Sequence, residues 1–179
     1  MAKSNRHPFF RAYLNDFHPT ADGSFVYAGT SLHWDPIGIS RAKALFLFWG
    51  LALVQAAAAV VCGCIPAPGM LNCFWVILPY IASVTALFLL IWALVRLTLS
   101  GNPLREYVHR ATVGRFPVLT GACMLACILT GLAEAVFLLV YGASGQGRQA
   151  GLFLVCQALG AVCPLLWRRL CGRLRWKAA

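Results

Sequence analysis

Charged residues are scarce in this chain of 179 amino acids: Asp, Glu, Lys and Arg make up 11% of it, and only five residues are acidic. A soluble domain carries about 25% charged residues and needs them to cover its surface. Apolar residues make up 60% of the chain. A soluble globular domain is therefore excluded, and an integral membrane protein is indicated. At this length the chain has room for one domain.

Sequence signatures of common catalytic sites are also missing. The chain has no glycine-rich phosphate loop, no Gly-x-Ser-x-Gly elbow and no His-Glu-x-x-His helix. A thiol oxidoreductase would need a Cys-x-x-Cys pair, which the eight cysteines do not form. The four histidines, His7, His18, His33 and His109, match no metal-ligand spacing. We therefore assign no catalytic residue, no metal site and no cofactor, and we expect a protein that is not an enzyme.

Long apolar segments are what the chain has in abundance. Four of them cover residues 44–63, 74–95, 116–141 and 150–167. A hydrocarbon core of ~30 Å needs ~20 helical residues, so three segments fit well and the fourth is slightly short. No short apolar core with a small-residue cleavage site precedes them, so we expect the first span to remain as an uncleaved anchor.

The connections between these spans are short, which favours antiparallel neighbours. The sequence therefore predicts an all-α membrane protein with four transmembrane helices in an antiparallel bundle. Three regions result: an N-terminal segment (1–42), the transmembrane domain (43–167) and a basic tail (168–179).

Basic residues are distributed unevenly around the spans. Of the 15 Lys and Arg residues, all but Arg148 precede the first span, lie between the second and third, or follow the fourth. The positive-inside rule then places both termini in the cytoplasm of a multi-pass protein of the cell membrane. We interpret the net charge of +10 as a determinant of orientation and of contact with anionic lipid headgroups at the cytoplasmic face, not with nucleic acid.

The N-terminal segment contains two candidate elements. Apolar side chains recur at helical spacing over 7–17, which predicts an amphipathic helix in the headgroup region or against the protein's own loops. Aromatic and β-branched residues at 24–27 and 30–34 predict a small β-hairpin. Two strands alone are marginal in water, so the hairpin must pack on another element or on the bilayer surface.

A second amphipathic helix is predicted between the second and third spans. Asn102 is a suitable N-cap, and Pro103 suits the first helical position. Glu106 and Arg110 then form an i,i+4 pair on the polar side. The apolar stripe consists of Leu104, Tyr107, Val108 and Ala111.

Glu134 is the one acid within the four spans. It lies seven residues, or ~10 Å of helix rise, from the outer end of its span. Gln55 and Gln157 lie at a similar depth in the first and fourth spans. We therefore predict an intramembrane polar cluster of Glu134, Gln55 and Gln157, with Arg148 of the outer loop as an alternative partner for the acid.

This cluster has competing interpretations. It can be a hydrogen-bonded clasp between helices, which is the interpretation that a single acid without a second carboxyl group favours. It can also be a site that handles protons or cations, because ionisable residues within membranes often mark pathways. In a third interpretation the acid extends toward the outer interface.

Cysteines at the outer face form a candidate disulfide. Cys64 and Cys73 bracket a turn rich in proline and glycine, on the side of the membrane where disulfides persist. The cysteines within the spans are expected to act as small hydrophobic residues.

Taken together, these patterns predict a small non-enzymatic membrane protein that acts as an interaction or accessory subunit. Its partner is either a second copy, giving a homo-oligomer, or another membrane protein. The alternative is a small oligomeric transporter or channel that uses Glu134. An enzyme that acts on lipid through cytoplasmic His and Asp residues is a third candidate.

Overall fold

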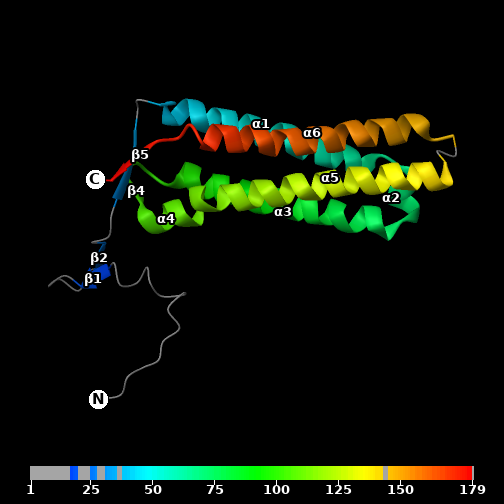
Figure 1. Ribbon diagram of the computed structural model, residues 1–179. Coiled ribbons are helices and arrows are strands. Elements are labelled where there is room, and N and C mark those ends of the chain that lie inside the picture. Colours follow the sequence, from blue (N-terminus) through cyan, green and yellow to red (C-terminus); the bar gives the residue numbers. More distant parts are fainter. Residues whose placement is uncertain (1–16, 20–24, 28–30, 36–37, 143–144, 179) are drawn as a thin grey trace, which may run out of the picture.

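The computed structural model describes residues 17–19, 25–27, 31–35, 38–142 and 145–178. Four long helices dominate it and run along a common axis (Figure 1). They are α1 (Arg41–Cys64), α3 (Phe74–Leu99), α5 (Phe116–Tyr141) and α6 (Gly147–Cys171). All four are long and apolar enough to cross a membrane. The predicted all-α bundle with four helices of membrane-spanning length is therefore confirmed.

The four helices form a closed ring of neighbours. The contacts join α1 to α3, α3 to α5, α5 to α6, and α6 back to α1. A short helix, α2 (Pro68–Asn72), lies in the connection between α1 and α3 and packs on both α3 and α5. We call this end of the bundle the α2 end. The opposite end carries a small β-sheet and is called the sheet end (Figure 1).

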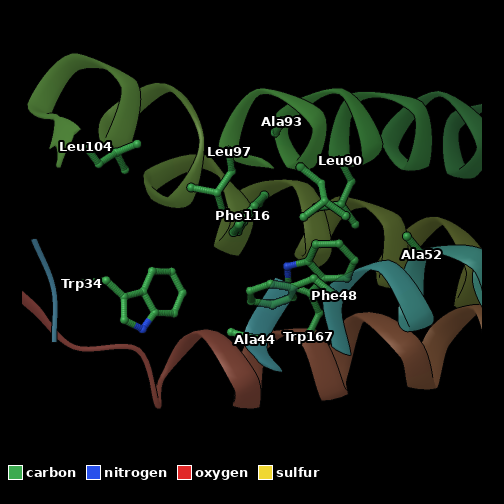
Figure 2. Packing of buried hydrophobic residues seen from close by; sticks show 11 residues of the cluster. Trp34, Ala44, Phe48, Ala52, Leu90, Ala93, Leu97, Leu104, Phe116 and Trp167 are labelled. Carbon is green, nitrogen blue, oxygen red and sulfur yellow. The ribbon is translucent and has the colours of Figure 1, made fainter. Parts of the chain in front are cut away.

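Aromatic rings fill the core of the bundle near the sheet end. Phe48 of α1 lies 4.8 Å from Trp167 of α6 and 5.7 Å from Phe116 of α5, measured between ring centroids. Each aromatic pair of this kind contributes ~0.5–1.5 kcal/mol beyond its buried area. Leu90 and Leu97 of α3 complete the cluster, so all four helices meet in it (Figure 2).

The sheet joins three segments that lie far apart in the sequence. Its central strand is β3 (Ser31–Trp34), with β4 (Leu104–Arg105) on one side and β5 (Trp176–Ala178) on the other. An ion pair of 3.4 Å between Asp35 and Lys177 extends the β3–β5 pairing. Strand β3, the loop after α3 and strand β5 near the C-terminus are thereby held against one another.

A small antiparallel strand pair is present in the N-terminal segment, but it does not consist of the two predicted strands. Strands do form at β2 (Phe25–Tyr27) and at β3, but they do not pair with each other. Instead β2 pairs with β1 (Phe17–Pro19) and β3 joins the sheet described above. The reason is physical: β3 pairs on both of its edges, which satisfies more backbone groups than an isolated hairpin does. Most of the predicted amphipathic helix at 7–17 lies outside the described residues, and its last residue is the first residue of β1.

The helix predicted after Asn102 begins later than expected. Leu104 and Arg105 are extended because they pair with β3, so α4 covers Glu106–Ala111 only and is followed by a short 3-10 turn, η2 (Val113–Arg115). The expected pair within this helix is present, with 2.7 Å between Arg110 Nη2 and Glu106 Oε1.

Candidate functional site

Glu134 is completely buried, although it is ionisable and lies within an apolar helix. Its Oε1 accepts a hydrogen bond of 3.2 Å from the backbone amide of Gly69 in α2. Buried polar groups are costly unless they are hydrogen-bonded. The acid of α5 therefore has its partner in the loop that closes the α2 end of the bundle.

The local sequence of α2 explains why an outside acceptor is needed. The first amides of a helix have no acceptor within it, and a side chain at the N-cap usually supplies one. Here the N-cap is Ala67, which makes no capping bond, and Pro68 at the first position has no amide hydrogen. The Gly69 amide is thus left over, and Glu134 supplies the missing cap from a helix 65 residues further along.

Gly69 is also the residue that lets Glu134 approach. A Cβ atom at position 69 would overlap Oε2 of Glu134, and it would lie 3.0 Å from Glu134 Cδ and 3.1 Å from Val76 Cγ2. Contacts this short require the neighbouring atoms to move, and here the neighbours are packed in the interior. The glycine is therefore required for close approach of the backbone to a buried carboxyl group.

Gln55 and Gln157 are buried as well, but they bind sulfur atoms rather than Glu134. Gln55 Nε2 donates to Cys123 Sγ at 2.8 Å and to the Gly160 carbonyl at 3.3 Å. Gln157 Nε2 donates to Cys62 Sγ at 3.4 Å. These bonds connect α1 with α5 and α6, so the two glutamines join helices, as residues of a clasp do. No hydrogen bond among the described residues links either glutamine to Glu134.

A small cavity brings the two glutamines together. It has a volume of about 10 Å³, and Tyr80, Ser83, Cys123, Gln55 and Gln157 are among its lining residues. A space of this size is at the lower limit for a single water molecule. Glu134 does not line it. The predicted cluster is thus divided into two sites, a glutamine–cysteine site and the cap on α2.

The remaining residues of the predicted site lie at the α2 end. Arg148, the alternative partner of the acid, is exposed at the start of α6 and makes no ion pair with Glu134 in the described part of the chain. Cys64 ends α1 and Cys73 precedes α3, and both are free thiols here. The disulfide between them stays a prediction.

Gly69 is the residue that the sequence analysis missed. The signal for it was a proline followed by glycine after a residue that cannot cap, Ala67-Pro68-Gly69. That pattern indicates a short helix whose first free amide needs an acceptor from elsewhere.

Among the described residues, no group of three or more His, Cys, Asp and Glu is placed to hold a metal ion.

No protein-family model, curated protein or solved structure matches this chain. Its class therefore rests on its own features: four helices of membrane-spanning length and composition, which support a multi-pass membrane protein.

Proposed function

We propose that this chain is a non-enzymatic multi-pass membrane protein that acts as an interaction or accessory subunit. The observation that carries the proposal is the cap on α2. Glu134, the acid on which a transport function would depend, is fully buried and holds the Gly69 amide at 3.2 Å. Holding this loop in place is a structural role, and it explains why α5 contains an acid at position 134.

The packing of the interior supports the same proposal. The cavity shared by Gln55 and Gln157 is about 10 Å³ in volume, which is too small for a solute larger than water. Polar side chains around it are used in bonds between helices. A bundle with such an interior is suited to presenting its outer surface to other membrane components.

The exposed face of α1 supplies a surface for a partner helix. Gly50 and Ala57 are both exposed and lie seven residues apart, which places them two turns apart on one face. A Cβ atom added to Gly50 would meet no other atom within 4 Å. Small residues of this kind allow helices to approach closely in lipid, where association depends on packing rather than on the hydrophobic effect.

For the orientation we propose that the sheet end faces the cytoplasm, together with both termini. The distribution of Lys and Arg supports this, and it also supports contact of the sheet end with anionic lipid headgroups in the cell membrane. Cys64 at the α2 end is exposed and is the natural reporter. After reduction of any Cys64–Cys73 bridge, a membrane-impermeant thiol reagent should label Cys64 from outside intact cells. Labelling of Cys64 only after permeabilisation would show that the orientation is the reverse.

The second candidate is a small transporter or channel, and one observation favours it. Oε2 of Glu134 is buried without a hydrogen-bond partner among the described residues. Intramembrane acids with a free oxygen are suited to taking up and releasing a proton. In this case the protein would be a small oligomeric transporter or channel that uses Glu134.

Purification in a mild detergent separates the two candidates. The accessory role predicts a second membrane protein at fixed stoichiometry. It should be lost in Ala57→Leu but kept in Ala122→Leu, the same change at an exposed alanine of α5. A closed homo-oligomer that survives Ala57→Leu would favour transport and contradict the accessory role. Thermal unfolding of each variant checks that the bundle itself is intact.

A further inference from the structure

A wide groove lies between α3 and α5 at the α2 end. Its volume is about 790 Å³, which is within the range of ligand-binding sites. Trp75, Leu78 and Pro79 of α3 form one wall, and residues of α5 from Leu129 to Tyr141 form the other. Nearly all of these side chains are apolar, so the groove needs an apolar occupant.

We propose that this groove holds one acyl chain of a phospholipid from the leaflet at the α2 end. The first argument is length. Leu129 and Tyr141 are twelve residues apart on α5, which corresponds to ~18 Å of helix rise. Half of a hydrocarbon core of ~30 Å is ~15 Å. The α5 wall of the groove therefore matches the depth of one leaflet and ends near the middle of the membrane.

The second argument is the chemistry along the groove. Its deeper part is lined by aliphatic side chains such as Leu129 and Leu132, whereas Trp75 and Tyr141 lie toward its outer end. Both of these rings are largely exposed, at 66% and 71%. Trp and Tyr prefer the level of the lipid headgroups because each has an apolar ring and a polar group. An amphiphile with its head at the rings and its chain below them fits this order.

The third argument is that the lining of the groove suits a lipid chain better than a partner helix. Helices that dock in lipid use small residues to approach closely, but among the described residues that line the groove Ala133 is the one alanine, and none is a glycine. Pro79 lies within α3, where a proline removes a helical hydrogen bond and bends the helix. The inference is independent of the proposed function, which uses the small residues of α1.

Photocrosslinking tests the proposal on the full chain in vesicles. The probe is phosphatidylcholine with a diazirine in one acyl chain, and labelled residues are mapped by mass spectrometry. Leu139 is the internal reference, because it is on the same helix, is 86% exposed and does not line the groove, whereas Leu132 is 58% exposed. Labelling is summed over probes with the diazirine at several positions along the chain, because Leu132 lies about 10 Å deeper than Leu139. Lipid that only surrounds the bundle would then label Leu139 more. A bound chain should label Leu132 several-fold more than Leu139.

Filling the groove should remove that preference. Val136→Trp places a large ring among the lining residues, so labelling of Leu132 should fall to the level of Leu139. Val140→Trp, at a second lining position, should do the same, and Leu139→Trp should leave the labelling of Leu132 unchanged. Thermal unfolding confirms that each variant is folded, which is expected because both valines are more than half exposed.

Two results would overturn the proposal. One is labelling of Leu132 that is no stronger than that of Leu139 in the unmodified protein, or that both tryptophan variants leave unchanged. The other is a homo-oligomer, seen by native mass spectrometry, that both tryptophan variants dissociate, because a second copy would then occupy the groove. Whether Ala57→Leu loses an accessory partner tests the proposed function only and leaves the lipid proposal unaffected.

Discussion

The cap that Glu134 places on α2 can be tested by adding a single methyl group. In Gly69→Ala the new Cβ overlaps Oε2 of Glu134 and lies 3.0 Å from its Cδ. Overpacking of this kind costs ~1–3 kcal/mol. If the carboxyl group moves away, the hydrogen bond from the Gly69 amide is lost as well, and polar contacts between helices in membranes contribute ~0.6–1.7 kcal/mol.

One term acts in the opposite direction. Alanine is favoured over glycine within a helix by ~0.5–1 kcal/mol. Combining the three terms, Gly69→Ala should lower the free energy of unfolding by about 1–4 kcal/mol. The measurement is an SDS titration in mixed micelles followed by circular dichroism. Gly121→Ala on α5 is the matched control, since a Cβ there meets nothing within 4 Å, and it should be neutral or slightly stabilising.

A double-mutant cycle identifies the atom responsible for the cost. In a Glu134→Ala background the carboxyl group is gone. Gly69→Ala should then leave the free energy of unfolding unchanged, or raise it by filling part of the space that Glu134 leaves. The coupling between the two substitutions should then exceed about 1 kcal/mol, within the range observed for residues in contact. If Gly69→Ala costs the same with and without Glu134, the carboxyl group is not the neighbour of Gly69 and the cap does not exist.

Two further predictions concern the cysteines. Gly160→Ala should destabilise the bundle, because its Cβ would lie 2.9 Å from Cys127 Sγ; Cys127→Ala should restore most of the stability, and failure to do so would place the clash elsewhere. If Cys64 and Cys73 form the predicted disulfide, reduction should shift the gel mobility of the unmodified protein but not that of Cys73→Ser. Absence of the shift in the unmodified protein would show that the disulfide does not form.

The four long helices could be predicted because their signal is local. Each is a continuous apolar run of the length that a bilayer requires, and the third predicted span has the same bounds as α5. Depth along a helix is local too, since it follows from counting residues at 1.5 Å each. This is why Glu134 could be placed near the outer end of its span before its surroundings were known.

The partner of Glu134 could not be predicted in the same way. Depth does not specify how each helix is rotated about its axis, so Gln55 and Gln157 at a similar level proved to face cysteines on neighbouring helices. Gly69 lies 65 residues away in a helix too short to show any periodicity. The residue type also does not show which backbone amide lacks a partner. Here the only indication is the Pro68-Gly69 pair.

The sheet was unpredictable for a related reason. Its strands are two to four residues long, and they come from the N-terminal segment, an internal loop and the C-terminal tail. Alternation cannot be recognised over so few residues. The sequence showed where extended residues lie at β3, but the pairing with β4 and β5 depends on how the four helices bring their ends together.

The role of Glu134 is most directly measured with Glu134→Gln in reconstituted vesicles. The amide keeps the size of the side chain and the oxygen that accepts from Gly69, but it removes the proton that a transport mechanism would use. We predict that the free energy of unfolding falls by no more than about 1.5 kcal/mol, the range for volume-conserving changes in a core, and that neither protein gives a proton or cation flux above that of empty vesicles. A flux in the unmodified protein that Glu134→Gln abolishes, with folding unchanged, would contradict the clasp and establish transport.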